Sequence, residues 1–209
     1  IKMIAVIDYG AGNIRSVYKA LKHIGCECVI TRDKNEILNA DGAVLPGVGS
    51  FGDTMDTMKS YGIKDTVIEY INSGKPFLGI CLGLQLLFPE SEESPNVKGL
   101  SVFDGTITKI PSGEGLKIPH IGWNSLKINK KSRLFKGVEQ NAYVYFVHSY
   151  FLNASDRSIV SAQTEYGVTI DAAVEKDNVF ATQFHPEKSG ETGLKILRNF
   201  ADIANGRKE

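Results

Sequence analysis

Residues 75–85 read KPFLGICLGLQ, a buried-strand pattern followed by a glycine-flanked turn and the start of a helix. The run 77–80 is apolar apart from one glycine, as in strands that are covered on both faces of a parallel sheet. Gly79 and Gly83 stand two residues before and after Cys81, and such small neighbours allow a sharp strand-to-helix turn. The turn would leave the Cys81 thiol accessible, and the positive end of the helix would favour its thiolate. The stretch therefore predicts an α/β fold with a nucleophilic cysteine at a strand end.

A second motif, QFHPE at residues 183–187, ends another apolar run far downstream. In an extended segment residues two apart point to the same side, so His185 and Glu187 can face one another. Pro186 favours this extended conformation. The carboxylate can then orient the imidazole and stabilise its charged form, as the third member of a triad does. Cys81, His185 and Glu187 are therefore candidates for a cysteine acyl-transfer site.

Each of these residues also has a simpler interpretation. A histidine can be structural or a metal ligand, and Cys81, His185 and Glu187 could bind zinc. A zinc site usually needs more nitrogen or sulfur ligands than Cys81 and His185 can supply. We therefore expect no metal, and we expect no cofactor. We expect Cys26 and Cys28 to be buried and to pack as small hydrophobic residues, because their spacing is unlike that of the cysteine pairs that bind zinc.

Strand and helix patterns alternate along the first part of the chain. The expected strands are 3–7, 26–31, 43–45 and 77–80, and the expected helices are 14–24, 33–39 and 63–73. This alternation is typical of a doubly wound α/β fold, with a mostly parallel central sheet and helices on both faces.

Strand patterns dominate the C-terminal half. Further strands are expected at 102–110, 125–128, 142–151, 158–163, 168–174 and 179–184, before a closing helix at 194–204. The short links between these strands favour antiparallel pairing. We expect residues 1–209 to form a single domain.

Composition excludes several classes of function. Lys+Arg and Asp+Glu both number 24, and this balance argues against binding to nucleic acid or to an anionic membrane, although a local basic patch would still allow it. No apolar run approaches the roughly 20 residues of a membrane span, and no secretory signal is visible. Three cysteines are too few for a disulfide framework. We therefore expect a cytoplasmic protein with no nucleic-acid partner and no membrane partner.

Two glycine-rich loops follow predicted strands. In PGVG, residues 46–49, a flexible loop could turn a backbone N–H toward a scissile carbonyl, although a plain turn explains the glycines equally well. The segment GAGNIR, residues 10–15, partly matches a dinucleotide fingerprint. Arg15 occupies the third glycine position, however, which argues against nucleotide binding.

Taken together, GICLGLQ, FHPE and PGVG resemble the triad (class I) glutamine amidotransferases over nearly the whole chain. A narrower resemblance is to the glutaminase subunits of imidazole glycerol phosphate synthases. The stretches that carry it are DYGAGN (8–13), PGVGSF (46–51), HIGWN (120–124), YFVHSY (145–150) and HPEKS (185–189).

The resemblance implies a role for each site residue. Cys81 is the implied nucleophile, His185 the acid and base, and Glu187 the residue that orients it. The backbone N–H groups of Val48 and Leu82 are the implied oxyanion hole. The implied substrate-binding residues are Gly47, Gly49, Gln85, Glu93, His148, Ser149 and Tyr150, with Glu93 meeting the α-ammonium group. The implied partner interface contains Asn13, Trp123, Tyr145 and Lys188.

The same resemblance implies hydrolysis of L-glutamine through a glutamyl thioester. The ammonia would pass to a (β/α)₈ barrel synthase subunit, with which the chain would form a heterodimer. That partner makes imidazole glycerol phosphate and aminoimidazole carboxamide ribotide in histidine biosynthesis. Three alternatives remain: a stand-alone cysteine hydrolase of the γ-glutamyl peptidase type, a glutaminase subunit of another synthase, and a non-catalytic α/β binding module.

Overall fold

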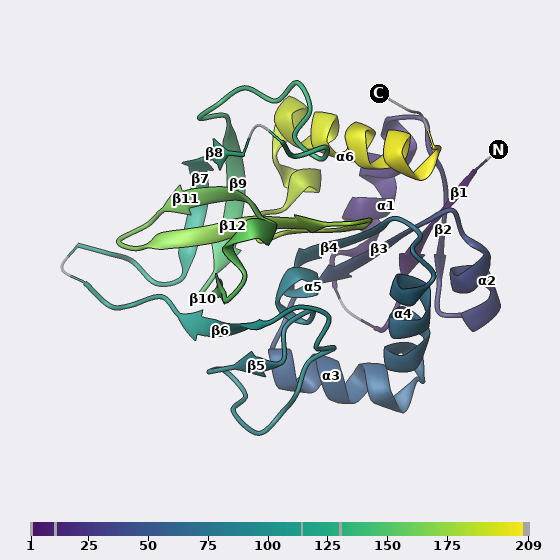
Figure 1. Cartoon of the computed structure of the whole chain (residues 1–209), viewed down its shortest axis with the longest axis horizontal. Coiled ribbons are helices and arrows are strands. Elements are labelled where there is room, and N and C mark those ends of the chain that lie inside the picture. The colour runs from purple at the N-terminus through teal and green to yellow at the C-terminus, as the bar shows by residue number, and fades with distance from the viewer. Residues whose placement is uncertain (1, 11, 114, 130, 207–209) are drawn as a thin grey trace.

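The computed structural model describes residues 2–10, 12–113, 115–129 and 131–206, and it has an α/β architecture around one large mixed sheet (Figure 1). Five strands run parallel in the order β2-β1-β3-β4-β13. They are β1 (Met3–Ile7), β2 (Glu27–Thr31), β3 (Gly42–Gly47), β4 (Phe77–Cys81) and β13 (Val179–Thr182). The out-of-sequence order confirms the predicted doubly wound sheet.

Helices cover both faces of this parallel region, as predicted. Helices α1 (Ile14–His23) and α6 (Gly190–Ala204) lie on one face, above the sheet in Figure 1. Helices α3 (Phe51–Ser60) and α4 (Ile63–Asn72) lie below it, and α2 (Lys34–Asn39) belongs to the same apolar cluster. Each face of the sheet has its own core. Phe200 of α6 is fully buried in one core, and Tyr70 of α4 is fully buried in the other.

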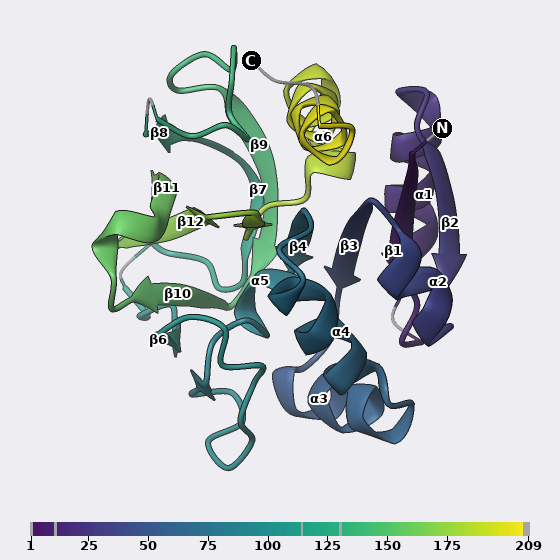
Figure 2. The ribbon, with the colours of Figure 1, turned by 45° about the vertical axis from the view of Figure 1, so that its right-hand side comes forward.

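The C-terminal half extends the sheet with mainly antiparallel strands, which confirms the second part of the fold prediction. The added strands are β5 (Glu90–Ser91), β6 (Gly105–Lys109), β8 (Lys127–Ile128), β10 (Tyr150–Ala154), β11 (Val160–Glu165) and β12 (Thr169–Lys176). A separate two-stranded antiparallel sheet contains β7 (His120–Ser125) and β9 (Tyr143–His148). Strand β9 lies beside α6 (Figure 2). The ring of Phe146 in β9 meets that of Phe184, which follows β13, at 5.8 Å between centroids.

Several predictions of secondary structure were wrong. Strand β7 was not predicted, and the expected strand 125–128 falls on the end of β7 and on β8, which belong to different sheets. The expected single strand 142–151 is two strands, β9 and β10, that belong to different sheets and meet at Ser149. Helix α3 was not predicted, although Ser50 caps it by accepting a hydrogen bond from the Asp53 N–H. Short 3₁₀ turns, η1 (Arg157–Ile159) and η2 (Pro186–Lys188), also replace expected extended segments.

No helix within the described residues is long and apolar enough to cross a membrane.

The glycines around Cys81 are required by close backbone contacts. A Cβ added to Gly83 would lie 2.0 Å from the Leu45 carbonyl oxygen, and one added to Gly79 would lie 2.5 Å from the Gly83 carbonyl oxygen. Neither neighbour is a flexible side chain, so the backbone itself would have to shift. Strands β3 and β4 and the short helix α5 (Leu82–Gln85) are thus held at a distance that only glycine allows.

We expect Gly83→Ala to lower the free energy of unfolding by about 2–3 kcal/mol, because overpacking forces a backbone shift. Urea denaturation followed by circular dichroism measures this change. The control is Gly113→Ala, whose added Cβ would have one near neighbour among the described residues, the Leu116 side chain at 3.9 Å. A Gly83→Ala protein as stable as this control would contradict the packing argument.

Candidate active site

The candidate site lies where the carboxyl ends of three neighbouring parallel strands meet. Cys81, the last residue of β4, pairs in register with Gly47 at the end of β3. On the other side of β4, β13 ends at Thr182, and the chain then runs on through Gln183 to His185. Ligand sites of open α/β sheets are commonly found at this edge. The topology therefore brings the two predicted motifs and the PGVG loop together.

Cys81 has the strained backbone that the glycine-flanked turn predicted. Its φ is +54° and its ψ is −106°, a conformation in which a non-glycine residue is uncommon. The residue is 7% exposed, and Gln183 donates from Nε2 to its sulfur at 3.7 Å. Helix α5, which follows directly, is only four residues long. The nucleophile candidate is therefore held at an elbow, with a hydrogen-bond donor beside its sulfur.

His185 and Glu187 form the predicted buried pair, although Glu187 lies in the 3₁₀ turn η2 and not in an extended segment. Nδ1 of His185 lies 2.8 Å from Oε1 of Glu187, and the two side chains are 1% and 0% exposed. Because a carboxylate only accepts, Nδ1 carries the proton, and the imidazole presents Nε2 on its other side. Nε2 is buried, and no group among the described residues makes a hydrogen bond to it.

The charge balance of this pair favours a protonated imidazole. Burial by itself would lower the pKa of His185, but the neighbouring Cys81 sulfur and the Glu187 carboxylate outweigh it and raise the pKa to about 9. His185 is therefore an imidazolium near neutral pH, and it lies beside the sulfur that would attack.

Asn13 approaches the same carboxylate. Its Nδ2 donates to Oε1 of Glu187 at 2.6 Å, from a backbone with φ of +68° that asparagine tolerates better than most residues. The sequence placed Asn13 only at a partner interface and gave no sign of this contact, since 174 residues separate the two positions. Oε1 of Glu187 thus accepts from both Asn13 and His185, and its orientation is set from two sides.

The PGVG loop lies against the elbow. A Cβ on Gly47 would lie 2.6 Å from the Tyr9 hydroxyl and 2.8 Å from Cβ of Leu82, while Gly49 has a φ of +110°. Both positions therefore require glycine, for crowding at Gly47 and for conformation at Gly49. Tyr9 was not predicted at the site. Its hydroxyl is buried without a partner among the described residues, and this burial raises its pKa.

Hydrogen bonds connect two of the predicted substrate residues, Gln85 and Glu93, to other parts of the candidate site. Nε2 of Gln85 donates to the Tyr150 carbonyl and to Oε1 of Gln183, both at 3.1 Å. Gln183 was quoted in a motif but given no role, and it links Gln85 to the cysteine. Oε2 of Glu93 accepts from the Phe51 N–H at 2.8 Å, at the start of α3 and just after the PGVG loop. His148, Ser149 and Tyr150 form the junction of β9 with β10.

An exposed aromatic surface lies next to this site, on the outer face of the β7–β9 sheet. Ile121, Trp123 and Tyr143 are 58%, 54% and 60% exposed. The Trp123 ring meets that of Tyr145 edge-on at 6.0 Å. Tyr145 connects this surface to the triad, because its carbonyl accepts from the His185 N–H at 2.9 Å. Lys188, also predicted at the interface, is exposed on η2.

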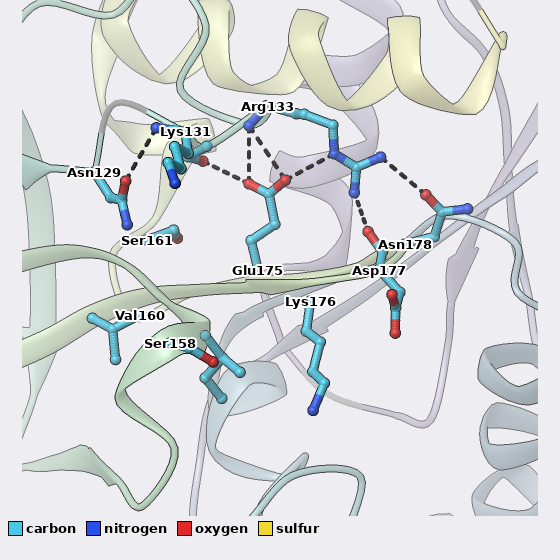
Figure 3. Close-up of a pocket in the computed structure, with 12 residues that line it drawn as sticks. Asn129, Lys131, Arg133, Ser158, Val160, Ser161, Glu175, Lys176, Asp177 and Asn178 are labelled. Atoms are coloured by element: carbon cyan, nitrogen blue, oxygen red, sulfur yellow. Dashed lines mark hydrogen bonds and ion pairs between the residues drawn. The ribbon is translucent and has the colours of Figure 1, made fainter.

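A polar cavity of about 570 Å³ lies at the opposite edge of the sheet (Figure 3). Asn178, on its rim, contacts the beginning of β4, whereas Cys81 lies at the end of that strand. Within the cavity Arg133 donates from Nε to Glu175 at 2.8 Å and from Nη1 to Asn178 at 3.2 Å. The charges of Arg133 and Glu175 therefore pair with one another and connect the loop that contains Arg133 to β12. This indicates a structural network.

The described part of the chain also contains no cluster of three or more His, Cys, Asp and Glu side chains suited to a metal ion.

Comparison with known proteins shows the family of this chain. Residues 5–204 match the family model for class-I glutamine amidotransferases. Imidazole glycerol phosphate synthase subunit HisH of Caldanaerobacter subterraneus subsp. tengcongensis is 52% identical over 96% of this chain and 98% of its own length. The subunit of the same name from Methanocaldococcus jannaschii is 48% identical over 96% of this chain and 100% of its own length.

Solved structures share the fold at lower identity. A crystal structure of a glutamine amidotransferase superposes with a TM-score of 0.77 at 21% identity, covering 97% of this chain and 98% of the other. The glutaminase domain of Trypanosoma brucei CTPS with bound acivicin gives a TM-score of 0.73 at 17% identity, covering 100% and 96%. The chain belongs to the class-I glutamine amidotransferase family, within the group that contains the imidazole glycerol phosphate synthase subunits HisH.

Proposed function

We propose that this chain is the glutaminase subunit of an imidazole glycerol phosphate synthase, which hydrolyses L-glutamine and supplies ammonia for histidine biosynthesis. The observation that carries this proposal is the strained Cys81 beside the buried His185–Glu187 pair. The relatives named as subunits of this synthase, 52% and 48% identical over almost their whole length, support the choice of synthase. Residues 1–209 act in this proposal as one amidotransferase domain.

The triad would perform the chemistry in two steps. The Cys81 thiolate attacks the side-chain amide carbon of glutamine, and the His185 imidazolium gives its Nε2 proton to the departing ammonia. The neutral imidazole then takes a proton from water, which attacks the thioester and releases glutamate. Glu187 keeps Nδ1 protonated and the ring in place throughout.

The surrounding groups would bind the substrate and stabilise charge. The Val48 and Leu82 N–H groups would meet the oxyanion, with Gly47 and Gly49 giving the loop its conformation. The amide nitrogen of Gln85 already donates twice, so its oxygen is the end that can accept from a bound glutamine. Glu93 would meet the α-ammonium group, and the backbone of residues 148–150 would cradle the rest.

The partner would dock on the exposed face of β7 and β9. Trp123 and Tyr145 would be central contacts, with Asn13 and Lys188 at the same interface. We also assign the exposed Ile121 and Tyr143 to this surface, because exposed aromatic and large apolar side chains mark protein interfaces. The partner is proposed to be a (β/α)₈ barrel subunit that receives ammonia next to the triad and forms a heterodimer with this chain.

Cys81→Ala should reduce glutamine hydrolysis by at least about 1,000-fold, because the only attacking group is lost. In complex with the barrel subunit, the same variant should still make imidazole glycerol phosphate from ammonium salt at alkaline pH, where free ammonia is abundant. Glutamate release measures glutamine hydrolysis, and consumption of the ribotide measures the synthase reaction. Loss of the ammonium-dependent reaction in an intact complex would show that Cys81 acts in the synthase step.

The kcat/KM for glutamine should fall as pH rises through about 9, because the raised pKa of His185 marks the loss of the proton that ammonia needs. The Glu187 carboxylate is one cause of this rise, so Glu187→Gln should move the alkaline limb to lower pH. Glu69→Gln on α4, which removes a surface carboxylate paired with Lys34, is the control. An alkaline limb unmoved by Glu187→Gln would refute the orienting role.

The isolated chain should be a poor glutaminase that the partner activates, because a mobile PGVG loop can leave the oxyanion hole unformed until docking orders it. Turnover is compared for the chain alone, for the complex, and for the complex with its ribotide ligand. Equal rates in all three would favour the stand-alone cysteine hydrolase. Activation by the barrel subunit of a different synthase would favour the other amidotransferase alternative.

A further inference from the structure

Two buried histidines outside the triad face each other across the β7–β9 sheet. His120 and His148 pair directly in register and are 2% and 6% exposed. Nδ1 of His120 lies 3.0 Å from Nε2 of His148. The His120 ring is stacked between those of Tyr166 and Phe146, at 3.9 and 4.8 Å between centroids. Apolar side chains would fill this space without the desolvation of two imidazoles, so the pair calls for an explanation.

The contacts of the pair allow one arrangement of protons. Nδ1 of His148 lies 2.8 Å from the Tyr150 carbonyl, which can only accept, so this nitrogen carries the hydrogen. Burial lowers the pKa of His148 to about 3 and that of His120 to about 4, so both rings are neutral at pH 7. Nε2 of His148 therefore accepts, and Nδ1 of His120 donates to it.

The ordered bonds lead to the proposed nucleophile. The Tyr150 carbonyl that accepts from His148 also accepts from Nε2 of Gln85 at 3.1 Å. That nitrogen also donates to Gln183, whose own amide donates to the Cys81 sulfur. At the outer end, Nδ2 of Asn124 lies 3.4 Å from Nε2 of His120 and 2.9 Å from the Glu165 carbonyl.

We propose that His120 and His148 are positioning residues that hold the Tyr150 carbonyl, and through it the Gln85 amide, in the orientation that receives glutamine. The proposal rests on the function argued above and adds two side chains to it. Neither imidazole touches the reacting atoms. Their effect is expected on the binding of glutamine, since they support the wall of the substrate pocket and leave the triad itself unchanged.

Matched substitutions of His148 separate its two hydrogen bonds. In His148→Asn the amide occupies the place of Nδ1 and can still donate to the Tyr150 carbonyl. In His148→Gln the amide occupies the place of Nε2, so the bond to Tyr150 is lost. Measured on the complex with the barrel subunit, KM for glutamine should stay within about threefold of wild type for Asn and rise about tenfold for Gln, the effect of one hydrogen bond. The change in kcat should be smaller than the change in KM.

A second pair tests the outer ring in the same way. His120→Asn keeps a donor at the Nδ1 position and His120→Gln loses it, while both lose the ring stacking. Both variants should therefore melt below wild type, His120→Gln lower because it also leaves the buried Nε2 of His148 without a donor. KM for glutamine should rise for His120→Gln and stay close to wild type for His120→Asn. A structural role alone would change stability and KM in parallel.

The proton arrangement can be read in the unmodified complex. The ¹⁵N chemical shifts of histidine should show the Nδ1–H tautomer for both rings, and an Nε2–H tautomer at His148 would overturn the proposal. Equal KM values for the Asn and Gln variants at both positions would also overturn the proposal. If His148→Gln does not fold, the two His120 variants and the ¹⁵N spectra decide. A wild-type complex without glutaminase activity would refute the proposed function, whereas an active one with indifferent variants would refute only this inference.

Discussion

The site depends on the close approach of the β3 and β4 backbones around Cys81. Gly83 contacts the Leu45 carbonyl oxygen at a distance that excludes any side chain, and this contact sets the direction in which the chain leaves β4. Cys81 is thereby held at positive φ, with its sulfur directed to the edge where β3 and β13 also end. A strained backbone persists only where its surroundings leave no alternative, and here two packed strands and a helix provide that constraint.

The environment of each imidazole explains why similar side chains take different charge states. His185 is buried beside a carboxylate and a sulfur, and these outweigh desolvation to favour the imidazolium. His148 and His120 are buried beside a carbonyl, an amide and each other, so desolvation prevails and both stay neutral. The charged ring suits proton transfer, whereas the neutral rings suit hydrogen bonds of fixed direction.

The proposed catalytic residues and the proposed docking surface lie at one end of the molecule. Tyr145 of β9 joins the exposed aromatic surface to the His185 backbone, and Asn13 joins the predicted interface to Glu187. The polar network of Arg133 and Glu175 stabilises the other end, far from Cys81 along β4. Contact with a partner at the first end would therefore bear directly on the groups that orient the triad.

The sequence by itself determined the fold class, the elbow and the Cys-His-Glu set, because strand patterns, flanking glycines and the spacing of His185 and Glu187 are local features. The division of 142–151 into β9 and β10 depended on which distant strands pair with each half, and so only the tertiary structure decided it. The same holds for Asn13 against Glu187, Gln183 against Cys81 and His120 against His148, which join residues 174, 102 and 28 positions apart. Hydrogen bonds between such residues leave no periodic pattern along the chain, since their partners meet only when the sheets assemble.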